Sequence, residues 1–200
     1  MRKLAAAFAA LALFAISSSI YSCENKNGSS QQSSTSSASN DSLIKRGAYL
    51  VTIMGCDDCH SPKKMGPKGP ELDLERRFSG HPASMPLAKI DRSQLSSWVL
   101  FHPNLTAFVG PWGVSYAAKI TSDPTGIGSW SEAQFIKALR EGKFKGMDNT
   151  RPLLPPMPWQ SFAKASDEDL KAIFSYLKST KPVSNVVPTA VAPDAIASLK

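Results

Sequence analysis

Two cysteines and a histidine stand close together in the chain, in the stretch Cys56-Asp57-Asp58-Cys59-His60. In a C-x-x-C-H pattern, two thiols separated by two residues reach the two vinyl groups of one haem and form thioethers. The histidine that follows is then carried beneath the iron. The spacing therefore predicts one covalent haem c, attached through Cys56 and Cys59, with the imidazole of His60 as the proximal iron ligand.

Two other types of cysteine site have the same spacing. A zinc half-site would need a second ligand pair, and the chain contains no second C-x-x-C. A redox dithiol of the thioredoxin type would need a strand before it and a helix after it. Here a segment with helical spacing precedes the motif, and the loop of residues 61–64 follows it. Both alternatives fit the sequence less well than haem attachment.

The sixth iron ligand has to be found from context. The candidates are Met65, Met85, Met147, Met157, His81 and His102. Met157 has Pro155 and Pro156 before it and Pro158 after it, and such a rigid loop fixes the direction of its side chain. A thioether is a weak ligand that benefits from this fixed direction, and Met/His ligation raises the reduction potential. We expect Met157 as the distal ligand, with Met147, His102, Met85 and His81 as alternatives.

Three helices are expected around these residues. Apolar side chains recur at helical spacing over residues 43–54, just before the motif, with Asp41 or Ser42 as the N-cap. Capping boxes predict a middle helix beginning after Ser131 and a last helix beginning after Ser166. The first and last helices would then bracket the motif and the proline-rich loop.

At this point the chain resembles the cytochrome c family. In that family the N- and C-terminal helices cross where a glycine meets an aromatic residue, and Gly47 against Phe174 or Tyr176 would fit. The family's axial methionine lies in a Pro-x-Met-Pro context before the final helix, as Met157 does. The resemblance implies an all-α cytochrome c fold, with terminal helices crossing around one covalent haem and with a loop-rich insertion.

A closer resemblance covers residues 43–183. Residues 120–131 are similar to a stretch in the cytochrome c subunits of membrane-bound alcohol and gluconate dehydrogenases, which usually read Asn-Leu-Thr-Pro-Asp and then Thr-Gly-Ile-Gly-x-Trp. This chain departs with Lys119 for Asn and Ser122 for Pro. Those subunits carry three haem motifs and this chain has one. The resemblance therefore supports a module fold and electron transfer, but it does not support membership of a dehydrogenase complex.

Further residues are expected near the haem. Trp130, Arg151 and Trp159 are candidates for haem contacts, and for either Trp a plain packing role is the alternative. Residues 61–118 exceed what a minimal cytochrome c needs between the motif and the middle helix. Their many prolines and glycines predict an ordered, loop-rich cover over one haem face, with room for a short hairpin.

The N-terminus reads as an export signal. Arg2 and Lys3 precede the 13-residue apolar run Leu4–Ile16, which is too short to span a bilayer. The small residue before Cys23 resembles the lipobox of bacterial lipoproteins, which implies a lipidated Cys23. Ordinary cleavage nearby, which would leave a free thiol, is the alternative. We expect an exported protein, lipid-anchored on the periplasmic side of a bacterial membrane.

Composition divides the rest of the chain. We expect a signal peptide at 1–22, a flexible, lipid-anchored tether at 23–42, a cytochrome c domain at 43–183 and a C-terminal tail at 184–200. The overall composition is globular, with 42% hydrophobic residues and 20% charged ones, which excludes a wholly disordered chain. The formal charge is +7 and falls to +5 without the signal peptide.

Three kinds of function fit these observations. The first is a membrane-tethered electron carrier, not an enzyme, whose iron cycles between Fe(III) and Fe(II). Its redox partners would include a membrane dehydrogenase or terminal oxidase. The alternatives are a haem-based gas or redox sensor and a haem enzyme, both with a labile sixth ligand. Aromatic residues do not interleave with the basic ones, so no nucleic-acid partner is expected.

Overall fold

The computed structural model describes residues 31–198, with side chains from 39 to 197. The predicted signal peptide and Cys23 lie outside this part of the chain. Its α-helices are α1 (Gln31–Ile53), α2 (Cys56–His60), α3 (Glu132–Glu141), α4 (Trp159–Phe162) and α5 (Asp167–Ser179). Its strands are β1 (Lys63–Gly66), β2 (Gly69–Leu72), β3 (Leu100–Phe101), β4 (Ala107–Gly110) and β5 (Gly113–Tyr116). Over the described residues, no helix combines the length and apolarity needed to cross a bilayer.

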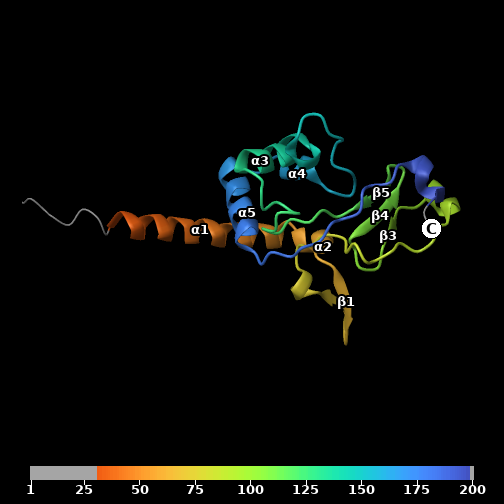
Figure 1. The fold of residues 1–200 in the computed structure, drawn as a ribbon, viewed down its shortest axis with the longest axis horizontal. Helices are drawn as coiled ribbons and strands as arrows, with labels where there is room; N and C mark the ends of the chain where they lie inside the picture. The colour runs from red at the N-terminus through yellow and green to blue at the C-terminus, as the bar shows by residue number, and fades with distance from the viewer. Residues whose placement is uncertain (1–30, 199–200) are drawn as a thin grey trace, which may run out of the picture.

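The fold is mixed α/β, so the expectation of an all-α fold was wrong. The insertion at residues 61–118 forms two antiparallel sheets, a β1–β2 hairpin and a three-stranded sheet in the order β3–β4–β5. Tight turns within a segment rich in glycine and proline allow adjacent extended pieces to pair. In Figure 1, α3, α4 and α5 lie together beside α1, and the three-stranded sheet lies toward the other end of the molecule.

The contact between the first and last helices is close at one glycine. A Cβ on Gly47 would overlap the carbonyl oxygen of Ala172 and lie 2.7 Å from the Cβ of Tyr176. The predicted contact between Gly47 and Tyr176 is therefore present. Because glycine lacks a side chain, the two backbones can approach this closely. Around the crossing, the main core cluster consists of Leu50, Val51, Phe78, Ile127, Phe135, Leu139, Leu170, Ala172, Ile173, Phe174 and Leu177.

The helix ends match the sequence signals in two of three cases. The Ser131 hydroxyl accepts a hydrogen bond from the Gln134 N–H at the start of α3, and Ser166 accepts one from Asp169 at the start of α5. The expected cap at Asp41 or Ser42 was wrong, because α1 is already helical from Gln31. Polar serines and glutamines carry no apolar periodicity, so the sequence pattern did not reveal this extension.

The three-stranded sheet has a small core of its own. The sheet cluster consists of Val109, Val114 and Ile196, with Leu87, Ile90, Leu95, Leu100, Tyr116 and Val191 packed against it. Val114 and Val191 exchange both backbone hydrogen bonds, at 2.8 and 3.0 Å, so the C-terminal tail covers the outer edge of β5. Figure 1 shows this tail running from α5 back to the sheet. Segments far apart in the chain thus close the molecule at the sheet end.

Candidate functional site

The haem motif forms the short helix α2, set off from α1 by Gly55. Gly55 has φ 66° and ψ 30°, a left-handed conformation that turns the chain between the two helices. Cys56 and Cys59 are free and partly buried, three residues apart on one turn of helix. Burial raises the pKa of the Cys56 thiol to about 12, with Asp57 adding to the rise. Two free thiols at this spacing are the groups that thioether formation requires.

The imidazole of His60 is held from outside the motif. Its Nδ1 lies 2.6 Å from the carbonyl oxygen of Ala118, so Nδ1–H is the donor and Nε2 keeps its lone pair. Burial lowers the pKa of His60, although the bond to Ala118 acts against this. A neutral ring of fixed tautomer is the form that binds iron. The donor set, two thiols and one oriented imidazole, therefore fits haem c.

Lys63 holds the end of the motif helix. Its Nζ donates to the backbone carbonyls of Asp57 (2.7 Å), Asp58 (2.6 Å) and Ser61 (2.8 Å). The last carbonyls of a helix have no partner within the helix, and a cation there also interacts favourably with the helix dipole. The side chain of Lys63 therefore fixes the position of α2.

Asp57 links the motif to two distant segments. Arg77 donates to both of its carboxylate oxygens, from Nε at 2.9 Å and from Nη2 at 2.6 Å. The Ser61 hydroxyl donates to Asp57 at 2.6 Å, and Arg77 Nη1 donates to the Tyr176 hydroxyl at 2.9 Å. Burial favours the neutral acid, but the hydrogen bonds from Arg77 and Ser61 outweigh it and lower the pKa of Asp57. This network connects α2 to the insertion and to α5.

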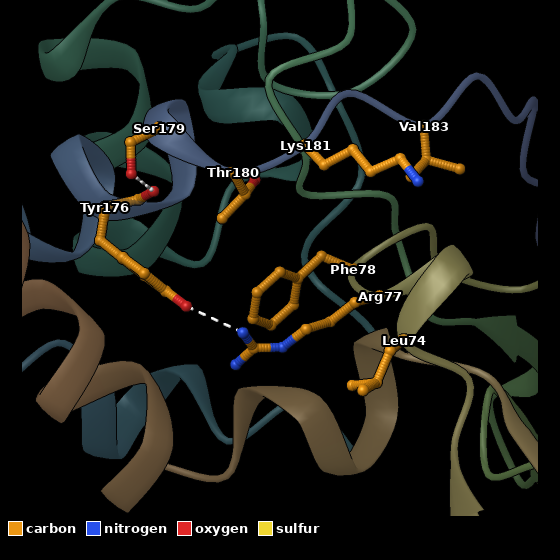
Figure 2. A pocket seen from close by; sticks show the side chains of 8 residues that line it. All are labelled: Leu74, Arg77, Phe78, Tyr176, Ser179, Thr180, Lys181 and Val183. Carbon is orange, nitrogen blue, oxygen red and sulfur yellow. Dashed lines mark hydrogen bonds between the residues drawn. The ribbon is translucent and has the colours of Figure 1, made fainter.

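A cavity of about 310 Å³ lies beside this network. Figure 2 shows Arg77 pointing toward Tyr176 across it, with Phe78 between Arg77 and the end of α5. The lining residues are Leu74, Arg77, Phe78, Tyr176, Ser179, Thr180, Lys181 and Val183. None of the predicted haem residues within the described chain is among them. The cavity therefore adjoins the motif only through Arg77, which holds Asp57.

The loop that carries Met157 lies directly before α4. We call residues 153–158 the Met loop. Met157 is partly buried and packs against the main core cluster, as Cys56 and Trp130 also do. The structure thus brings the predicted distal ligand and one thioether cysteine against the same core, although the ligand assignments themselves stay predictions.

The alternative ligands have other surroundings. Met65 is 81% exposed on β1 and Met147 is 46% exposed. His81 is buried, with Nδ1 2.8 Å from the Thr106 hydroxyl and Nε2 3.0 Å from the Met85 carbonyl oxygen. His102 and Met85 lie near His81. The centres of the His102 and His81 rings are 5.8 Å apart, and Met85 Sδ accepts a hydrogen bond from Asn104. These three residues belong to a polar cluster beside the three-stranded sheet.

The candidates for haem contacts differ in their environment. Trp130 packs against the main core cluster. The Trp159 ring lies against Gly142, at the end of α3, so close that a Cβ there would overlap it. The Arg151 guanidinium lies 3.9 Å from the centre of the Phe144 ring and is exposed. Packing contacts are therefore present for both Trp residues.

Lys63 and Arg77 were not identified from the sequence as parts of the site. Arg77 is 20 residues from Asp57, and no short motif connects the two positions. For Lys63, a cation just after a helix is a known C-terminal signal. That signal was available in the sequence, whereas the contact of Arg77 depends on the fold of the insertion.

Comparison with known proteins gives a consistent group of relatives. The chain is 36% identical over 138 residues to the gluconate 2-dehydrogenase cytochrome c subunit of Pantoea cypripedii. It is 27% identical over 146 residues to the cytochrome c subunit of the quinone alcohol dehydrogenase of Gluconobacter oxydans, and 28% identical over 148 residues to the fructose dehydrogenase cytochrome subunit of Gluconobacter japonicus. No protein-family model matches the chain.

The chain matches a cytochrome c module of dehydrogenase complexes. The matches cover 68% to 72% of this chain but 23% of each of these relatives. The cytochrome c module therefore spans about a quarter of the length of these curated relatives. The similarity supports haem c as the cofactor and electron transfer by a cytochrome.

Proposed function

We propose that this protein is a single-haem, membrane-tethered c-type cytochrome that transfers electrons and catalyses no reaction of its own. Haem c would supply one-electron chemistry, with iron alternating between Fe(III) and Fe(II). Cys56 and Cys59 would hold it by thioethers, and His60 and Met157 would be its axial ligands. The observation that carries this proposal is the fixed His60 ring, whose Nδ1–H donates to Ala118 and leaves Nε2 for iron.

The residues around the motif would restrict movement at the haem. Lys63 fixes the end of α2, and Arg77 fixes Asp57 within the motif. A rigid site keeps the same ligands in both oxidation states, which suits electron transfer. Partly buried Cys56 and Met157 on the main core cluster would limit water at the iron. Trp130, Arg151 and Trp159 remain candidates for contact with the haem edge.

The partners proposed for this carrier follow from its relatives and its N-terminus. The relatives are named as subunits of gluconate, alcohol and fructose dehydrogenases, so a membrane dehydrogenase is the proposed electron donor. A terminal oxidase is a candidate acceptor. A lipid on Cys23 would hold the exported protein at the periplasmic side of the membrane. Replacement by Cys23→Ser should move the haem protein from the membrane fraction to the soluble fraction, and an unchanged distribution would contradict lipidation.

Visible spectra of the purified protein test the ligands. We expect a low-spin c-type spectrum, a Met–iron charge-transfer band when oxidised, no effect of CO when reduced, and one haem per chain. Met157→Ala should abolish the band, lower the reduction potential and open the iron to CO. Met147→Ala, an exposed methionine, is the matched control and should change nothing.

Other outcomes would change the assignment. A high-spin spectrum or a CO shift in the unaltered protein would contradict a closed His60/Met157 site and favour a gas sensor or a haem enzyme. An unaltered spectrum for Met157→Ala would remove Met157 as the ligand, and the alternative methionines and histidines would be tested next.

A further inference from the structure

We propose that Ser115 is a positioning residue for Met157, because its hydroxyl fixes the Met loop to the three-stranded sheet. This inference rests on the proposed ligation of iron by Met157. It gives the insertion at residues 61–118 a role in the electron-transfer site, as the support of the distal ligand.

The Met loop has few hydrogen-bond donors of its own. Pro155, Pro156 and Pro158 have no N–H. The N–H of Met157 is already used, since it donates to the carbonyl oxygen of Leu154 at 3.3 Å. A loop with so few donors can form little internal hydrogen bonding, so its other carbonyl groups need donors from elsewhere in the molecule.

Ser115 supplies such a donor. Its hydroxyl donates to the carbonyl oxygen of Pro155 at 2.6 Å and accepts a hydrogen bond from Trp112 Nε1–H at 3.1 Å. A hydroxyl has a single proton, so the bond from Trp112 directs that proton toward Pro155. Ser115 is 6% exposed, which limits competition from water. The hydrogen bond therefore fixes the chain two residues before Met157.

The sheet gives this hydroxyl a firm base. Side chains alternate along a strand, so Val114 and Tyr116 point to the opposite face from Ser115. Val114 and Tyr116 pack in the sheet cluster, and Ser115 is paired with Phe108 of β4. Figure 1 shows β5 on the side of the sheet that faces α3 and α4, and the chain before α4 reaches toward it.

The flanks of the Met loop are held by α3. The N–H of Leu153 donates to the carbonyl oxygen of Gly142 at 2.7 Å, and the Trp159 ring packs against the same glycine. The middle of the loop, where Met157 lies, depends on the bond between Ser115 and Pro155. Loss of that bond should free the middle of the loop while both flanks stay in place.

The test compares holoproteins that carry Ser115→Ala, Ser115→Thr and Thr106→Val. For Ser115→Ala we expect a weaker Met–iron charge-transfer band, a lower reduction potential and a CO affinity raised by about tenfold, as loss of one buried hydrogen bond implies. Ser115→Thr keeps the hydroxyl and should restore the values of the unaltered protein. All three quantities report the iron ligand and need no partner protein.

Thr106→Val is the matched control. Thr106 is buried next to β4, and its hydroxyl meets Asn104 and His81 and not the Met loop. Its loss should lower the thermal stability and leave the band, the potential and the CO affinity unchanged. An equal change in Thr106→Val and Ser115→Ala would show a general loosening and overturn the inference.

Two further outcomes are decisive. Ser115→Ala with the band, potential and CO affinity of the unaltered protein would overturn the inference, and the proposed function would stand if Met157→Ala still opens the iron. If Met157→Ala leaves the band, the potential and the CO affinity unchanged, the proposed ligation of iron by Met157 is itself overturned. If Ser115→Ala does not retain haem, Trp112→Phe should shift all three quantities in the same direction by a smaller amount, and its failure to do so would also overturn the inference.

Discussion

A single ammonium group, that of Lys63, satisfies three backbone carbonyls at the end of the haem motif helix. Hydrogen bonds to a charged group stabilise a protein more than neutral ones do, and a carbonyl left without a donor adds a penalty. The effect of this residue should therefore exceed that of an ordinary surface lysine.

We expect Lys63→Met to lower the free energy of unfolding of the holoprotein by roughly 2–3 kcal/mol. The carbonyls of Asp58 and Ser61 lose the ammonium donor, the carbonyl of Asp57 keeps only the Ser61 N–H at 3.3 Å, and the apolar part of the side chain is kept. Denaturant unfolding followed by haem absorbance measures the change. Lys64→Met, at the exposed neighbouring position, is the control and should have little effect. Equal stability of the two variants would contradict the role of Lys63.

Lys119, one of the two departures from the dehydrogenase sequences, forms a charged pair with Asp123, the residue after the other departure, Ser122. Lys119 is buried, and its Nζ lies 2.5 Å from Asp123 Oδ1 and 3.0 Å from the Val183 carbonyl oxygen. The hydrogen bond from Lys119, with others from Thr125, lowers the pKa of Asp123 to about 2. The pair fixes the chain after α5 to the loop before Gly128.

This pair predicts an acid-sensitive contribution to stability. The folded pKa of Asp123 lies below its ordinary value of 3.8, so its contribution is complete above pH 3.8 and is lost as the pH falls toward 2. Asp123→Asn should be less stable at neutral pH, because Lys119 loses its partner. The difference from the unaltered protein should shrink between pH 4 and pH 2. Thermal melts across this range measure it, and a constant difference would contradict the assignment.

At the scale of the elements, the crossing of α1 and α5 depends on the absence of a side chain at Gly47. We expect Gly47→Ala to destabilise the protein by about 1–3 kcal/mol, since the added methyl overlaps the Ala172 carbonyl group. Alanine is more favourable than glycine in a helix interior by at most about 1 kcal/mol, which does not compensate for this overlap. Lys45→Ala, at an exposed position of the same helix, should be near neutral. Denaturant titration measures both variants.

The sequence predicted those elements that local signals define. The caps at Ser131 and Ser166 and the contact of Gly47 with Tyr176 follow from spacing and family resemblance, and all three are present. The sequence left room for one short hairpin in the insertion, but not for two sheets, because the strands are two to four residues long and lack a clear alternation. Their pairing depends on contacts across the fold, which one sequence does not reveal.

The candidate site divides in the same way. Cys56, Cys59 and His60 form a local motif, so the sequence alone suffices to predict them as haem residues. Ser115 reaches the Met loop across 40 residues, and the residue type alone gives no indication of that contact. Supporting residues of this kind lie far along the chain from the groups they hold, so they come to light only in three dimensions.

At the scale of the whole molecule, the C-terminal tail completes the sheet end. Removal of residues 186–200 would take away the pairing of Val191 with Val114 and the buried side chain of Ile196. We expect a loss of roughly 2–3 kcal/mol from Ile196 alone and self-association through the uncovered edge of β5. Unfolding and light scattering measure the two effects. Val186→Ser, at a position that is 70% exposed, should leave the protein stable and monodisperse.

The early start of α1 also changes how far the haem motif can travel. A helix over Gln31–Ile53 is about 35 Å long. A flexible tether would let the haem motif occupy every distance from the point of attachment up to the length of the tether. A rigid helix would instead hold the haem motif at a nearly constant distance from the point of attachment. The local concentration of the motif would then be high for redox partners at that distance and low for partners closer to the attachment point. If the chain is attached to a membrane before Gln31, the choice of redox partner would depend on the height of the partner's site above the membrane as well as on its chemistry.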